Sequence, residues 1–116
     1  MVNKVILIGR LTSDPELRTS AAGLQVAKLR LATNTYGGKD EQGVRKEHSE
    51  FHTLVLFGRQ AEIASDYLRK GKLVYADGRL QTNSWEDSEG KKQRSTEIIV
   101  DNFQMLGPRA AEEAAA

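Results

Sequence analysis

Apolar and polar residues alternate along several stretches of the chain, as they do in half-buried β-strands. The clearest alternation runs over residues 24–35 and 46–58. In the first stretch, Ala27, Leu29 and Leu31 share one face. In the second, one face carries Phe51, Val55 and Phe57, and the other carries Leu54 and Leu56. A period of two is typical of strands that turn one face to a core. The pattern therefore predicts two strands, each with a second face that carries other side chains.

Three further strands are expected, at residues 2–12, 72–83 and 95–106. The first is a β-branched and apolar run that stops at a Ser-Asp-Pro turn signal. The other two are separated from their neighbours by glycine-containing or polar stretches, which is typical of strands.

One amphipathic helix of about three turns is expected at residues 59–69, because the period changes there. Ile63 and Tyr67 lie four residues apart, and so do Ala64 and Leu68. This spacing places each pair on one face of a helix. The predicted order of elements is β-β-β-α-β-β.

Two polar stretches that contain glycine, at residues 36–43 and about 86–93, are expected to be long flexible loops. Five strands with one short helix bury their apolar faces best in a closed arrangement. The expected fold class is all-β: an OB-fold, a five-stranded Greek-key barrel with one short helix between strands 3 and 4. Residues 1–107 are expected to form this domain, and residues 108–116 a disordered tail.

The composition and spacing of reactive residues argue against an enzyme. The 116 residues include no cysteine, which excludes a disulfide scaffold, a thiolate metal site and a cysteine nucleophile. His48 and His52 would be about 13 Å apart on a strand, too far to share a metal ion. Gly38 and Gly43 are not followed by the Lys-Ser/Thr of a phosphate-binding loop. We expect no catalytic residue, no metal and no cofactor.

Four of the seven aromatic residues lie where they could stack on nucleic-acid bases: Tyr36, Phe51, Phe57 and Trp85. Tyr36 opens the first expected loop, and Trp85 stands among polar residues where the second begins. Two alternatives stay open, namely that Trp85 folds back under its loop and that the two phenylalanines pack in the core. The aromatic residues expected in the core are Tyr67, Tyr75 and Phe103.

Basic residues accompany these aromatic residues, although the net charge is only +1. They occur in or beside strands and at the helix ends: Lys4, Arg10, Lys28, Arg30, Arg59, Arg69, Lys70, Arg79 and Arg94. Cations neutralise phosphates and exposed rings stack on bases, so a groove for single-stranded nucleic acid needs both. For each single cation, ordinary solvated surface charge is the alternative.

Several motifs resemble, in order, the bacterial single-stranded DNA-binding protein family. They are VNKVILIGRL at 2–11, DPELR at 14–18, VLFG at 55–58, YLRKG at 67–71, GRL at 78–80 and MLG at 105–107. The resemblance extends nearly from end to end of residues 1–107. It implies an OB-fold domain that forms a homotetramer and binds and protects single-stranded DNA without sequence preference in replication, recombination and repair. An RNA-binding or accessory OB domain and a purely structural oligomerisation module are the alternatives.

The resemblance implies roles for particular residues of this sequence. The stacking residues are Tyr36, Phe51, Phe57 and Trp85; the first two stand where the family often has Trp. The basic DNA contacts implied by the family are Lys4, Arg59, Arg69 and Lys70, to which we add Arg10 from the charge pattern.

Subunit contacts are expected at Asn3, Val5 and Leu7, because the edge of the first strand is apolar and needs a cover. His52 is a further interface candidate. Family members typically end in an acidic tip that recruits replication and repair proteins, and this chain ends in EEAAA. We therefore expect a truncated or naturally tipless tail that does not recruit them. No apolar run approaches the ~18 residues of a membrane span, so we expect no membrane partner and a cytoplasmic, nucleoid-associated protein.

Overall fold

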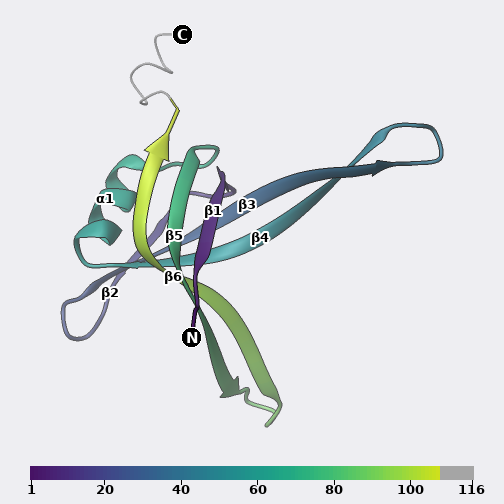
Figure 1. The fold of residues 1–116 in the computed structure, drawn as a ribbon. Helices are drawn as coiled ribbons and strands as arrows, with labels where there is room; N and C mark the ends of the chain where they lie inside the picture. Colours follow the sequence, from purple (N-terminus) through teal and green to yellow (C-terminus); the bar gives the residue numbers. More distant parts are fainter. Residues whose placement is uncertain (108–116) are drawn as a thin grey trace.

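The computed structural model describes residues 1–107, which form six strands and one helix (Figure 1). In chain order these are β1 (Val5–Leu11), β2 (Glu16–Thr19), β3 (Gln25–Lys39), β4 (Arg45–Phe57), α1 (Arg59–Tyr67), β5 (Leu73–Glu86) and β6 (Lys92–Leu106). The tail expected at 108–116 lies outside the described residues. Within the described part, no helix is long and apolar enough to cross a membrane.

Five of these strands close into a barrel, which confirms the predicted OB-fold. Their hydrogen-bonded order is β1-β5-β6-β4-β3, and β3 returns to β1 where Ala32 pairs with Arg10. The pairing of β4 with β6 is parallel, and the other neighbours are antiparallel. Gly9 permits the closure, because a Cβ at this position would lie 2.3 Å from the carbonyl oxygen of Ala32.

The sequence analysis missed the short strand β2. It follows β1 after the expected Ser-Asp-Pro turn and pairs with the first residues of β3. All four of its residues are exposed, so it carries no apolar alternation from which a strand would be predicted. With β2 counted, the helix lies between β4 and β5, which are the third and fourth strands of the barrel.

The inside of the barrel holds the hydrophobic core. Ala27, Leu29 and Leu31, the apolar positions on one face of the first alternating stretch, belong to it. Leu54 and Leu56 belong to it as well, which shows which of the two faces of the second stretch is buried. Beside the barrel, α1 packs on it through Ala61 and Ala64 (Figure 1). The helix ends at Tyr67, because Leu68 takes an extended backbone and buries its side chain in the core. Tyr67 is exposed, so its prediction as a core residue is wrong.

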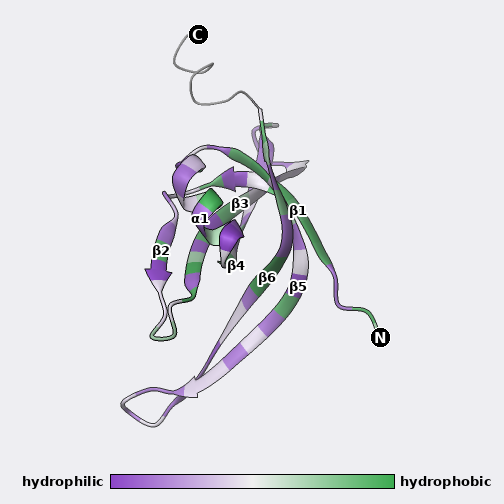
Figure 2. Cartoon of the chain, turned by 90° about the vertical axis from the view of Figure 1, so that its left-hand side faces the viewer, coloured by the Kyte–Doolittle hydropathy of each residue, from purple (hydrophilic) through white to green (hydrophobic). Residues whose placement is uncertain are grey.

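Two long hairpins project from the barrel in different directions (Figure 1). The outer halves of β3 and β4 form one, here named the β3–β4 arm (residues 33–51), and those of β5 and β6 form the β5–β6 arm (residues 80–97). The expected loops are therefore mostly strand, with tight turns at the tips. The β5–β6 arm is mainly hydrophilic toward its tip (Figure 2), so apolar alternation fades before the strands end.

Candidate nucleic-acid interface

Four strands of the barrel share one continuous face on its outside. Lys28 on β3 lies opposite Val55 on β4, Val55 lies opposite Ile99 on β6, and Ile99 lies opposite Arg79 on β5. Directly opposed residues of a sheet point to the same side. We name this surface the outer sheet face; it comprises alternate residues of 26–36, 45–57, 79–85 and 93–99.

All four predicted stacking residues lie on the outer sheet face. Alternation along β4 places Phe51 and Phe57 there, the β3–β4 register adds Tyr36, and alternation along β5 adds Trp85. Their exposed fractions are 61% for Tyr36, 55% for Phe51, 41% for Phe57 and 50% for Trp85. The two phenylalanines are therefore not core residues, and Trp85 does not fold back under a loop.

Tyr36 and Trp85 are held by strands, not by loops as the sequence analysis expected. Tyr36 pairs with Glu47, and Trp85 pairs with Gln93 in the β5–β6 ladder. Side chains on a paired strand have a defined direction, perpendicular to the sheet. Each ring consequently has a defined place on the outer sheet face.

The tips of the two arms are closed by turns of the same design. Asp40 and Asp87 each accept, through Oδ1, the N–H groups two and four residues ahead, all at 2.9 Å. The N–H of Lys91 is the main cause that holds the pKa of the Asp87 carboxyl below its ordinary value, with further lowering from Gln93. These bonds stabilise the ends of the strands that carry Tyr36 and Trp85.

Basic side chains lie between the rings on the outer sheet face. The Cζ atom of Arg30 lies 5.8 Å from the ring centroid of Phe51, and that of Arg45 lies 5.7 Å from the centroid of Tyr36. These are cation–π distances. Nearer the barrel, Lys28 and Arg79 form ion pairs; the cations lie 3.4 Å and 3.8 Å from carboxylates of β6.

Sequence reasoning did not select these four cations as binding residues. It counted Lys28, Arg30 and Arg79 among the basic residues of the strands and did not consider Arg45. Strand alternation was the available signal, because residues an even number of positions apart lie on the same face. Arg30 lies on the face of its strand that points away from the core, and Arg45 is an even number of residues from Phe51.

The five cations that were selected lie elsewhere and are mostly engaged within the chain. Lys4 and Arg59 form ion pairs of 3.2 and 3.1 Å, the latter with Glu62. Arg10 and Arg69 donate to backbone carbonyls. Arg10 lies on β1 and Lys4 directly precedes it, whereas Arg59 begins α1 and Arg69 and Lys70 follow its last residue closely. The structure does not gather them with the rings, and their contact with DNA stays a prediction.

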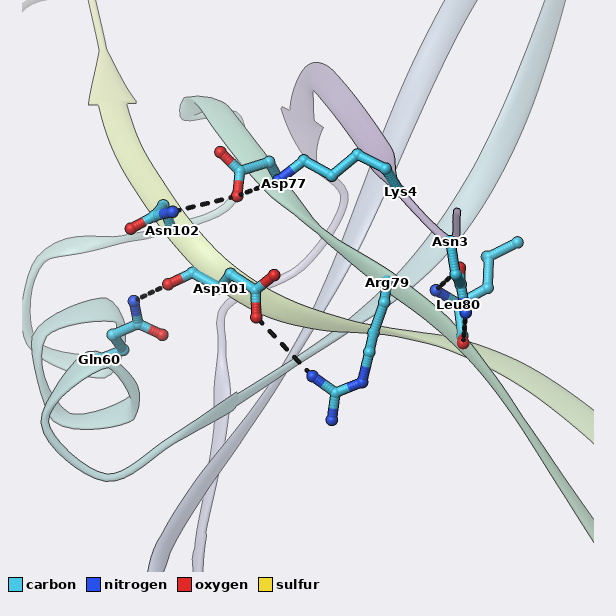
Figure 3. Close-up of polar contacts among 8 residues, drawn as sticks. All are labelled: Asn3, Lys4, Gln60, Asp77, Arg79, Leu80, Asp101 and Asn102. Carbon is cyan, nitrogen blue, oxygen red and sulfur yellow. Dashed lines mark hydrogen bonds and ion pairs between the residues drawn. The ribbon is translucent and has the colours of Figure 1, made fainter. Parts of the chain in front are cut away.

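Asp77 joins β1, β5 and β6 through a polar cluster on another face of the barrel (Figure 3). It accepts hydrogen bonds from Tyr75 at 2.6 Å and from Lys4 and Asn102 at 3.2 Å. The bond from the Tyr75 hydroxyl is the main cause that lowers the pKa of Asp77, and the same bond raises the pKa of Tyr75. Asp77 is the one buried charged residue in the described part of the chain.

The predicted subunit-contact residues of β1 point inward. Val5 and Leu7 pack against the core, whereas Ile6 and Ile8 are exposed. The run Val-Ile-Leu-Ile is apolar on both faces, so the sequence contained no phase information that would decide which pair faces out. The exposed apolar surface of this strand is therefore formed by Ile6 and Ile8.

The other two predicted subunit-contact residues bond within their own chain. The side-chain amide of Asn3 exchanges two hydrogen bonds of 2.9 Å with the backbone of Leu80 (Figure 3). The ring Nε2 of His52 lies 2.9 Å from the hydroxyl of Thr33. His52 lies on the opposite side of the β3–β4 ladder from Phe51.

Exposed rings and cations on one sheet face of such a barrel are typical of OB-fold proteins that bind oligonucleotides. The sequence profile of the single-strand binding protein family matches residues 2–106. The chain belongs to the single-strand binding protein family. Proteins of this family bind single-stranded DNA and are not enzymes.

Individual proteins similar to this chain agree with that assignment. Single-stranded DNA-binding protein 1 of Chlorobaculum tepidum is 48% identical over 109 residues, which cover 93% of this chain and 67% of that protein. The fold is also similar to a solved complex of the Plasmodium falciparum protein of this family with single-stranded DNA, with a TM-score of 0.83 and 29% identity, covering 92% of this chain and 97% of the other.

A third similar protein is a deletion mutant of the single-stranded DNA-binding protein from Thermus aquaticus. Its structure matches with a TM-score of 0.77 and 36% identity. The match covers 93% of this chain and 52% of the Thermus chain. The present chain thus spans about half the length of that protein.

Proposed function

We propose that this chain binds and protects single-stranded DNA without sequence preference during replication, recombination and repair, and that the outer sheet face is the binding surface. The observation that carries the proposal is the presence of four exposed rings on one face of one sheet. Every base offers a π-face, so rings stack on any sequence. Family membership supports DNA as the ligand.

The spacing of the rings suits an extended strand. Phe51 is six residues from Phe57, or about 20 Å along β4. Tyr36 lies opposite Glu47, which is about 13 Å beyond Phe51 on the same strand. Trp85 lies on the second arm. A single strand would run from the β3–β4 arm across the barrel to the β5–β6 arm. Duplex DNA keeps its bases stacked on each other, so it cannot use the rings.

A second set of phosphate contacts is proposed at the two ends of α1. Arg59, Arg69 and Lys70 lie there, and Arg59 begins the helix two residues after Phe57. Together with Lys4 and Arg10 on the β1 side, they would neutralise the phosphates of DNA that continues past the sheet.

We also propose that the chain assembles as a homotetramer. The support is the exposed pair Ile6 and Ile8 on β1, together with the edge of β1 between Val5 and Gly9, which has no partner strand among the described residues. Exposed apolar strand edges are usually covered. A second copy of the chain, paired edge to edge, would bury both features, with Asn3 and His52 near the contact.

Association with the nucleoid is proposed to follow from DNA binding. Recruitment of replication and repair proteins is not proposed, because the sequence analysis expects that this chain does not recruit them. The acidic tip through which family members are expected to recruit such proteins would lie at the C-terminus, and residues 108–116 are outside the described part of the chain. The expectation about these partners therefore stays a prediction.

A mobility-shift experiment with three matched nucleic acids tests the proposal. The chain is titrated into oligo-dT, a duplex of the same length and a single-stranded RNA. The highest affinity is expected for oligo-dT, and the affinity should fall as salt rises, because phosphates neutralised by the protein release counterions. Equal affinity for duplex and single strand would contradict the proposal. Preference for RNA would favour an RNA-binding domain, and no binding at all would favour an oligomerisation module.

A further inference from the structure

We propose that Arg30 and Arg45 are DNA-binding residues that work as pairs with Phe51 and Tyr36. In each pair the ring stacks on a base, and the guanidinium binds a phosphate of the same stretch of DNA. The inference rests on the proposed function of the outer sheet face and adds two phosphate contacts to it.

The two pairs are built in the same way across the β3–β4 ladder. Arg30 lies on β3 and covers Phe51 of β4, whereas Arg45 lies on β4 and covers Tyr36 of β3. The carbon-to-centroid distances are 5.8 and 5.7 Å. Diagonal neighbours on one face of antiparallel strands are within reach of long side chains. The arm therefore carries two cation–ring units in succession.

Both guanidinium groups have their charge available. Within residues 1–107, the guanidinium groups of Arg30 and Arg45 form no ion pair and donate no hydrogen bond. On the same face, Lys28 and Arg79 are compensated by Glu97 and Asp101. An incoming phosphate meets an uncompensated cation at the arm, so binding there breaks no existing ion pair.

The chemistry of arginine makes stacking and phosphate binding compatible. A guanidinium that lies on a ring keeps its N–H donors at its edge, where they can form two parallel hydrogen bonds to phosphate oxygens. An ammonium group is a compact point charge that offers no such planar arrangement. The ring thus positions the donors beside the base that it stacks on.

Salt-dependent binding of oligo-dT distinguishes these roles. Arg30→Met and Arg45→Met remove the charge and keep the apolar stem. Each is expected to weaken binding about fivefold to tenfold. Each should also reduce the slope of log K against log salt by about 0.7, which is the value for one phosphate on a single strand. Arg30→Lys and Arg45→Lys should keep the slope but bind less tightly than the unmodified chain. Arg94→Met is the control, because Arg94 is exposed on the opposite side of the β5–β6 arm from Trp85 and should bind like the unmodified chain.

A double-mutant cycle tests whether cation and ring act as a unit. Combining Arg30→Met with Phe51→Ala should cost less affinity than the product of the two single losses, because the two side chains serve one nucleotide. Met variants that bind with the affinity and salt slope of the Arg94→Met control would overturn the inference while leaving the proposed function intact. A weaker affinity with an unchanged slope would also overturn it. If the unmodified chain fails to prefer oligo-dT over duplex, the proposed function itself fails.

Discussion

Phe51 and Leu54 are three residues apart on β4 and lie on opposite sides of the sheet: Phe51 is exposed on the outer sheet face, and Leu54 is fully buried in the barrel. Phe51→Ala should lower the affinity for oligo-dT by about 5- to 150-fold, the equivalent of about 1–3 kcal/mol for one stacked base. Its melting temperature should change little.

Leu54→Ala is the matched variant for that experiment. Loss of a fully buried leucine should lower the free energy of unfolding by about 2–5 kcal/mol, while the folded protein keeps its affinity for DNA. Denaturant unfolding and DNA titration of both variants check the pair. If Phe51→Ala destabilised the fold and bound normally, the assignment of the two faces would be wrong.

Trp85→Ala should reduce the affinity for oligo-dT by a similar factor of about 5 to 150. Half of the side chain is exposed on the β5–β6 arm, so thermal stability should be nearly unchanged; a buried Trp would cost about 3–5 kcal/mol. Trp85→Phe keeps a ring and should retain more affinity than the alanine variant. Normal binding with a large loss of stability would show that Trp85 serves packing.

Much of the barrel could be predicted because its strands have one buried face. The inward residues of β3, among them Leu29 and Leu31, were placed correctly from alternation alone. Alternation along β4 did not decide which face is buried, because Phe51 and Phe57 make one face apolar, and Leu54 and Leu56 the other. The helix was also found, because its period differs from that of the strands around it. The end of the helix and the exposure of Tyr67 were not predicted, because Leu68 leaves the helix to fill the core.

The arms and the cations of the site could not be predicted in the same way. Beyond the barrel, Tyr36 and Trp85 lie on hairpins that have no core beneath them, so the sequence there looks like a loop. Arg30 and Arg45 became candidates only when the strand register placed them over rings. Which residues of β1 face outward could not be predicted either, because its apolar run leaves neither face polar.

Ile6→Glu combined with Ile8→Glu should reduce the size of the assembly. Both side chains are exposed on β1, and two carboxylates would be buried without partners if a second copy covered them. Val44→Glu is the control: Val44 is exposed at the tip of the β3–β4 arm, away from β1. Light scattering at micromolar concentration should give a tetrameric mass for the control and a smaller mass for the double variant. An unmodified chain that is monomeric would refute the proposed assembly.

Acid should remove the stabilisation that Asp77 provides. Its pKa is lowered in the folded protein, chiefly by the Tyr75 hydroxyl, so the carboxylate form stabilises the fold. That contribution is fully present above the ordinary pKa of about 3.9 and is lost as the pH falls through the lower folded value. The difference in melting temperature between the unmodified chain and Asp77→Asn should therefore be largest near neutral pH and shrink below about pH 4. A difference that stays constant down to pH 2 would contradict this role.

The most direct test of the outer sheet face as the binding surface uses Trp85, the only tryptophan in the chain. Its fluorescence is followed in the unmodified protein during titration with oligo-dT, and binding is measured in parallel by mobility shift. Stacking of a base on Trp85 should quench the signal in a saturable way, at the same DNA concentrations that shift the protein, and a duplex of equal length should quench far less. Complete binding of oligo-dT with unchanged Trp85 fluorescence would contradict the account.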